Sequence, residues 1–154
     1  MKKIFILVLW IISFLSLATG VWAEDDEMTK KTKELCVKGN SAACFSIGER
    51  YRTVDRDNKT ALTFYVKSCD AGYMTGCTNG GILLVMKGTP YSKEFKQARK
   101  MFTKACGAGE DPSCFNLGSL NYKEGRQKKA LQYYLKACDM GNQAGCAKHK
   151  RLSR

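Results

Sequence analysis

The stretch Cys69-Asp-Ala-Gly72-Tyr-Met-Thr-Gly-Cys77 decides the fold, because its pattern occurs four times in the chain. In every copy the second cysteine follows the first by eight residues, and a glycine follows the first cysteine by three. The cysteine pairs are Cys36 and Cys44, Cys69 and Cys77, Cys106 and Cys114, and Cys138 and Cys146, and the glycines are Gly39, Gly72, Gly109 and Gly141. The four copies use all eight cysteines of the chain.

The spacing of each cysteine pair predicts a chain reversal. On one continuous helix, residues eight apart are separated by about 12 Å along the axis, whereas a disulfide needs Cα atoms within about 4.4–6.8 Å. If each pair is bridged, the helix must end between its two cysteines. The glycine suits that break, because it adopts the left-handed conformation just past a helix end. We therefore predict four helical hairpins, stapled by disulfides 36–44, 69–77, 106–114 and 138–146.

The alternative for the cysteines is zinc binding. Zinc sites usually contain cysteines about two to four residues apart, and this chain has no such pair. We therefore favour structural disulfides and expect neither a metal nor a cofactor.

The first residues predict export. Two lysines at positions 2 and 3 precede an apolar run over residues 4–17, and small side chains at Val21 and Ala23 precede the acidic residues 24–27. These are the features of a cleaved signal peptide, which we place at residues 1–23; the alternative is an uncleaved anchor. The run is short for a membrane span, which needs about 20 residues. A secreted or periplasmic location also agrees with disulfides and an even cysteine count.

The chain is strongly basic, with a formal net charge of +12. Removing residues 1–23 takes away two lysines and no acid, which leaves +10. This charge favours anionic surfaces or ligands. For an exported protein we expect envelope polymers, acidic glycans or acidic peptides rather than nucleic acid. The alternative is that the charge confers solubility alone.

The first cysteines of the four copies are 33, 37 and 32 residues apart, and repeats of this length predict a solenoid. Before the first cysteine, an alanine at offset −8 and large apolar residues at −5 and −4 trace one face of a helix. These residues are Ala61, Ala98 and Ala130, then Phe64 and Tyr65, Met101 and Phe102, and Tyr133 and Tyr134. We expect Tyr65, Tyr133 and Tyr134 in the core.

A second helix is predicted after the second cysteine, with a glycine four residues on in three repeats. These glycines are Gly48, Gly81 and Gly118. Since a glycine inside a helix costs about 1 kcal/mol relative to alanine, its repetition indicates a close approach between helices. We predict one domain over residues 24–154, with repeats at about 27–54, 57–92, 94–124 and 127–152. A loop with Gly88 and Pro90, over residues 86–94, joins the second and third repeats.

The unit Asp57-x-Lys59-x-Ala61-x-x-Phe-Tyr65-x-Lys67-x-Cys69-Asp-x-Gly72-x-x-x-Gly76-Cys77-x-Asn79-x-Gly81 resembles the Sel-one-like repeat. More narrowly, the chain resembles the Helicobacter cysteine-rich protein family over about residues 27–150. It departs from the pattern at Leu84 and Asn121, where a tyrosine is usual. The resemblance implies an all-α, tetratricopeptide-like α/α superhelix with one disulfide per repeat, exported by a bacterium. It also implies penicillin binding with weak β-lactamase activity, whereas Sel-one-like repeats more generally act as adaptors.

The residues themselves give an enzyme little support, and the assignment stays open. No serine has a lysine three residues on, which is the pattern of serine β-lactamases. A metal-dependent β-lactamase needs several histidines, and the chain has only His149, which we expect to be solvated. Our main hypothesis is a scaffold that binds peptides, peptidoglycan fragments or partner proteins. The alternatives are a weak β-lactamase and a basic protein that coats anionic surfaces.

Two sets of residues are candidates for ligand binding. Asn79 and Asn116 each stand two residues after a second cysteine, so their amides are placed to bind an extended peptide backbone or a β-lactam. The lysines that stand two residues before a first cysteine are placed to meet carboxylates; they are Lys67, Lys104 and Lys136. The alternative for both sets is a structural role, which for the lysines is stabilisation of a helix C-terminus, worth about 0.3–1 kcal/mol each.

Overall fold

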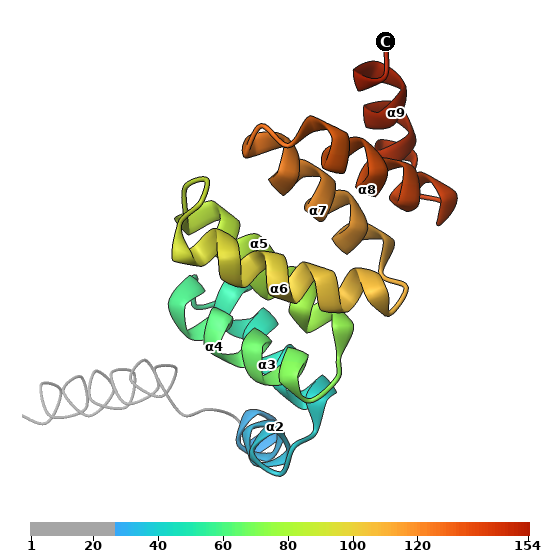
Figure 1. Ribbon diagram of the computed structural model, residues 1–154. Helices are drawn as coiled ribbons and strands as arrows, with labels where there is room; N and C mark the ends of the chain where they lie inside the picture. Colours follow the sequence, from blue (N-terminus) through green and yellow to red (C-terminus); the bar gives the residue numbers. More distant parts are fainter. Residues whose placement is uncertain (1–26) are drawn as a thin grey trace, which may run out of the picture. The chain divides into compact units, whose positions relative to one another are not determined.

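A computed structural model describes residues 27–154 of the chain, which contain eight helices and no β-strand (Figure 1). The helices are α2 (Glu27–Val37), α3 (Ser41–Thr53), α4 (Asn58–Asp70), α5 (Met74–Lys87), α6 (Lys93–Gly107), α7 (Asp111–Lys123), α8 (Gln127–Asp139) and α9 (Gln143–Leu152). Residues 31–154 form one compact unit. The predicted signal peptide lies outside the described residues and stays a prediction. Each helix in the described part of the chain is too short or too polar to span a membrane.

The helices form four hairpins, each joined by one disulfide. The pairs are Cys36–Cys44, Cys69–Cys77, Cys106–Cys114 and Cys138–Cys146, with Cα atoms 4.6–4.8 Å apart. This is the predicted pairing, and it makes the chain an all-α solenoid of stapled repeats, which confirms the predicted fold class.

The turn between α4 and α5 shows why the glycine is needed. Gly72 has φ +93°, in the left-handed region. Its N–H donates to the carbonyl of Cys69 at 3.1 Å, and the N–H of Tyr73 donates to the carbonyl of Ser68 at 3.0 Å. These two bonds form the Schellman motif that closes a helix end. The same left-handed glycine recurs at each of the other three turns, at Gly39, Gly109 and Gly141.

Successive repeats pack through a glycine and an aromatic ring. The second helix of one repeat lies against the first helix of the next, so that α3 packs on α4, α5 on α6 and α7 on α8. A Cβ at Gly48, Gly81 or Gly118 would lie 2.5–2.8 Å from the ring of Tyr65, Phe102 or Tyr134, respectively. The close approach predicted for these glycines is therefore confirmed.

Two details of the sequence-based prediction need correction. Tyr65 and Tyr134 are buried as expected, but Tyr133 is only half-buried at the edge of the core. The join predicted at residues 86–94 is shorter, because α5 continues to Lys87 and α6 starts at Lys93. The side chain of Ser92 sets that start by accepting a hydrogen bond from the N–H of Phe95 at 3.3 Å, which is the usual role of an N-cap serine.

Candidate functional site

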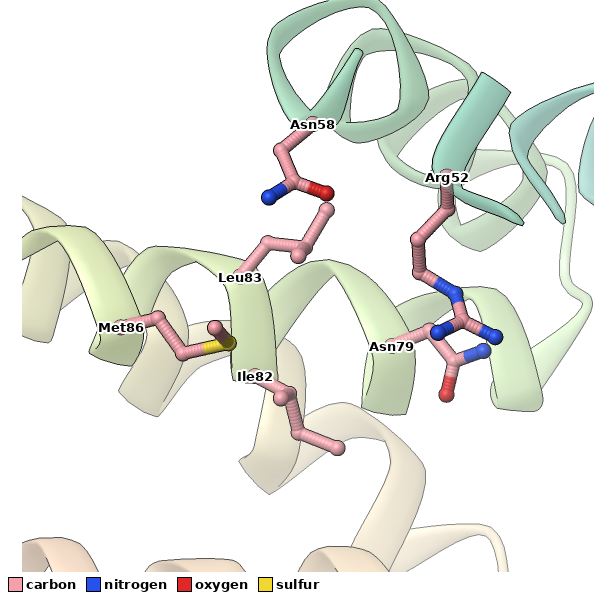
Figure 2. Close-up of a pocket in the computed structure, with 6 residues that line it drawn as sticks. All are labelled: Arg52, Asn58, Asn79, Ile82, Leu83 and Met86. Atoms are coloured by element: carbon pink, nitrogen blue, oxygen red, sulfur yellow. The ribbon is translucent and has the colours of Figure 1, made fainter. Parts of the chain in front are cut away.

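Two adjoining hollows lie along the helices α3, α5 and α7. The first has a volume of about 410 Å³, and its lining comprises Arg52, Asn58, Asn79, Ile82, Leu83 and Met86 (Figure 2). The second has a volume of about 180 Å³, and its lining comprises Ile82, Val85, Met86, Phe102, Asn116, Ser119, Leu120 and Lys123. Because both hollows share Ile82 and Met86, they form one continuous surface, which we call the groove.

The groove follows from the register of the repeats. It is lined by the residues two, five, six and nine positions after the second cysteine of a repeat. On α5 these are Asn79, Ile82, Leu83 and Met86, and on α7 they are Asn116, Ser119, Leu120 and Lys123. Residues three and four apart lie on one side of a helix, so each helix presents the same positions. The disulfides and the glycine–aromatic contacts set these faces side by side, since α5 and α7 also touch each other.

A polar network closes the α3 end of the groove around Glu49. Asn79 Nδ2 donates to Glu49 Oε1 at 2.7 Å, and Arg52 Nη2 donates to Glu49 Oε2 at 2.8 Å. The Tyr65 hydroxyl also donates to Glu49 and accepts from Arg52 Nε at 3.0 Å. One carboxylate thus ties together side chains from α3, α4 and α5.

The network shifts the pKa values of its members. Burial alone would raise the pKa of Glu49, but the hydrogen bonds from Arg52, Tyr65 and Asn79 and the charge of Arg52 outweigh it and lower the pKa below its ordinary value. Burial and the hydrogen bond to Glu49 raise the pKa of Tyr65 to about 12. At neutral pH, Glu49 is therefore an acceptor and Tyr65 a donor.

The charge on Glu49 orients the amide of Asn79. An ionised carboxylate only accepts hydrogen bonds, so Asn79 must turn its NH₂ group toward Glu49. Its carbonyl oxygen then faces elsewhere. Figure 2 shows the side-chain nitrogen of Asn79 on the side of Arg52 and the oxygen turned away from it. Asn79 therefore presents an oriented acceptor, next to a guanidinium whose Nη1 the network leaves unused.

Apart from Lys123, the rest of the lining is apolar or neutral. Ile82 and Met86 are 39% and 72% exposed, although both are large and apolar. The lining contains two cations, Arg52 and Lys123, and no acidic side chain. Ile82 and Met86 thus expose apolar surface beside the polar side chains of the lining.

The structure separates the residues predicted from the sequence into two groups. Asn79 and Asn116 both line the groove, but the three lysines lie outside its lining. Lys104 donates to the carbonyl of Cys69 at the end of α4, Lys67 lies 5.3 Å from the centre of the Phe64 ring, and Lys136 is exposed in the last turn of α8. Their places fit the structural alternative, and ligand binding by any of the five residues stays a prediction.

Sequence reasoning missed Glu49, Arg52, Ile82, Met86 and Lys123. A usable signal was present, because Ile82 and Met86 follow Asn79 by three and seven residues, and Ser119 and Lys123 follow Asn116 by the same intervals. His149, expected to be solvated, is half-buried on α9. Within residues 27–154, no three His, Cys, Asp or Glu side chains are grouped so as to hold a metal ion.

Stapled helical hairpins that pack in register and line a groove define the class of α/α-repeat scaffolds. The family model of the Sel1 repeat matches residues 41–73, 80–110 and 111–142, so the chain belongs to the Sel1 repeat family. Sel1 repeat proteins generally mediate protein–protein interactions.

Solved structures show the same fold. A Sel1 repeat protein from Oxalobacter formigenes is 18% identical, with a TM-score of 0.63, over 79% of this chain and 96% of that one. Cysteine rich protein B (hcpB) of Helicobacter pylori is 22% identical, with a TM-score of 0.56, over 81% of this chain and 97% of that one. Comparison with curated proteins found no match. The four disulfides indicate an extracytoplasmic protein, because disulfides form and persist mainly in oxidising compartments.

Proposed function

We propose that the protein is an exported scaffold whose groove binds extended peptide segments, either of partner proteins or of peptidoglycan. The observation that carries the proposal is the oriented amide of Asn79, which lies beside the exposed apolar side chains of Ile82 and Met86. An extended backbone offers N–H groups at regular intervals, and the oriented carbonyl oxygen of Asn79 can accept a hydrogen bond from one of them. The apolar side chains supply the contact area that such polar pairing lacks.

Binding should depend on the two groove asparagines. The test measures binding of peptidoglycan stem peptides and of a displayed octapeptide library to the exported protein. We expect Asn79→Ala and Asn116→Ala each to weaken binding about two- to tenfold, which corresponds to about 0.5–1.5 kcal/mol for one hydrogen bond. The control is Gln97→Ala, because Gln97 is an exposed amide on α6 outside the lining. Equal binding by all four proteins would refute the proposal.

Export itself has a separate test. The proposed signal peptide ends at Ala23, so the mature protein should begin at Glu24. N-terminal sequencing of the protein from the periplasm and from the medium would check both the cleavage site and the final location. Protein in the membrane fraction whose sequence still begins at residue 1 would instead support an uncleaved anchor.

A second candidate function is β-lactam hydrolysis, which the resemblance to the Helicobacter cysteine-rich proteins implies. Ser119 and Lys123 lie one turn apart on α7 and line the same hollow as Asn116. Serine β-lactamases pair a serine with a lysine about three residues on, whereas the spacing here is four. Turnover of a chromogenic cephalosporin that Ser119→Ala abolishes, and that Ser46→Ala leaves intact, would establish the activity. Under our first proposal, neither variant nor the parent protein shows turnover.

A further inference from the structure

We propose that the groove selects segments in which a bulky apolar side chain stands next to an acidic residue. This inference rests on the proposed function and deepens it, because it names the chemistry of the partner. The apolar side chain enters the hollow between α5 and α7, and the carboxylate pairs with Lys123.

The hollow between α5 and α7 has the size and the walls for one side chain. Its volume is about 180 Å³, well below the roughly 300–1,000 Å³ of pockets that enclose a small molecule. Five of its eight lining residues are apolar: Ile82, Val85, Met86, Phe102 and Leu120. Because Phe102 and Leu120 are 1% exposed and held by the core, the inner wall is rigid. A leucine, isoleucine, methionine or phenylalanine side chain fits such a site.

Lys123 places a positive charge beside this hollow. It lies in the last turn of α7, it is exposed, and it lines the hollow together with Asn116 and Ser119, which are both neutral. The only other charge in the lining of the groove is Arg52. A carboxylate entering the groove therefore meets two cations and no acidic lining residue.

A basic segment would meet the opposite situation. Two carboxylates adjoin lining residues, and both are already paired: Glu49 accepts hydrogen bonds from Arg52, Tyr65 and Asn79, and Glu124 forms ion pairs with Arg99 and Arg126. Glu49 accepts four hydrogen bonds, two of them from Arg52, and these fill the roughly four acceptor sites of a carboxylate. With a formal net charge of +12 on the whole chain, long-range attraction also favours acidic segments. Charge complementarity therefore selects an acidic partner over a basic one.

The test is selection from a displayed octapeptide library by the full exported protein. We expect enrichment of Leu, Ile, Met or Phe within two positions of Asp or Glu. The variant Lys123→Glu should lose the acidic preference and keep the apolar one. The control is Lys150→Glu, because Lys150 is also exposed in the last turn of its helix but lies outside the groove. It should leave both preferences unchanged.

The best peptide then gives a quantitative check by fluorescence polarisation. Replacing its acidic residue by the matching amide should weaken binding about two- to fivefold, as expected for one exposed ion pair. The Lys123→Glu protein should bind both peptides equally or prefer the amide.

Each outcome separates the inference from the function on which it rests. Apolar enrichment without acidic residues, if lost in Ile82→Asp, overturns the inference and leaves the groove as a peptide site. An acidic preference that persists in Lys123→Glu also overturns it. No enrichment, or enrichment unaffected by Ile82→Asp and Asn79→Ala, overturns the proposed function and the inference together. Since Ile82 and Lys123 are exposed, circular dichroism should show all variants folded.

Discussion

The contacts between successive repeats, which we call joints, all pack a glycine against an aromatic ring: α3 on α4 is the first joint, α5 on α6 the second and α7 on α8 the third. The first and second joints differ in the polarity of the groups around that ring. In the first joint, Gly48 of α3 receives the ring of Tyr65, whose hydroxyl bonds Glu49 and Arg52. In the second joint, Gly81 of α5 receives the ring of Phe102, which has no polar atom and lines the apolar hollow. The same backbone approach therefore produces a polar end of the groove at α3 and an apolar part between α5 and α7.

The residue after each glycine is polar where the ring carries a hydroxyl and apolar where it does not. It is Glu49 beside Tyr65 and Ile82 beside Phe102. In the third joint it is Ser119, whose oxygen accepts from the hydroxyl of Tyr134 at 3.2 Å. The glycine and the ring thus pack the repeats together, while the residue after the glycine sets the polarity of the groove at that repeat.

The largest expected effect comes from filling a joint. A Cβ at Gly81 would lie 2.5 Å from Cε1 of Phe102, a ring that is 1% exposed and cannot easily move. We expect Gly81→Ala to lower the free energy of unfolding by about 1–3 kcal/mol, as overpacking does. The matched control is Gly107→Ala, because a Cβ there meets no atom within 4 Å, and it should be neutral or slightly stabilising. Urea unfolding of the oxidised proteins measures both. Equal stability of Gly81→Ala and the parent would contradict the packing described for the joint.

The second prediction tests the polar network around the Tyr65 hydroxyl at the first joint. Tyr65→Phe removes a donor to Glu49 and an acceptor of Arg52 Nε. A hydrogen bond to a charged group is worth about 1.5–3 kcal/mol, and the partial exposure of this cluster places our expectation at the lower end, about 1.5 kcal/mol. Tyr134→Phe loses one neutral bond and should cost only about 0.5–1 kcal/mol. If urea unfolding gave the two variants the same loss, the charged network would not differ in strength from the single bond of the third joint.

The difference between the joints also explains what the sequence predicts well. The stapled turns follow from local constraints, because the cysteine spacing and the left-handed glycine leave one way to close each hairpin. Gly48, Gly81 and Gly118 were predictable as points of close approach, and Asn79 and Asn116 as one register of the groove. Each of these predictions needs only positions within a repeat.

Contacts between repeats were much harder to predict. Tyr65 was expected only as a core residue, because its apolar ring gives the periodic signal and its hydroxyl does not. The bond from Lys104 to the carbonyl of Cys69 joins residues 35 positions apart. Its existence depends on the offset between two repeats, which the volume of the buried rings sets. Spacing along the chain does not reveal that offset.

The third prediction concerns variants in which the side-chain pair of the second joint, Phe102 and Ile82, is replaced by the tyrosine and serine of the third joint. Phe102→Tyr would place a hydroxyl against Ile82 at the wall of the hollow, and we expect a loss of about 1 kcal/mol, the low end for a poorly paired polar group near water. Adding Ile82→Ser reproduces the Tyr134 and Ser119 pair and should recover part of that loss. A double-mutant cycle in urea measures the coupling. If the changes in unfolding free energy of the two single variants simply added in the double variant, the side chain after the glycine would have no energetic coupling to the ring.

The smallest expected effect is a pH dependence confined to the first joint. Because the hydrogen bonds and the charge of Arg52 outweigh burial, the pKa of Glu49 in the folded protein lies below its ordinary value near 4.5. The stabilisation from ionised Glu49 is then complete above that ordinary value and is lost as the pH falls through the lower folded value. The difference in unfolding free energy between the parent and Glu49→Gln should therefore be largest at neutral pH and should shrink below about pH 4.5. Other carboxylates titrate in both proteins and cancel in this difference.

Ile82→Gln, which changes the equivalent position of the second joint, should show a difference from the parent that does not vary with pH. A constant difference for Glu49→Gln as well would mean that the carboxylate gains nothing from its donors, and that the two joints differ in composition but not in electrostatics.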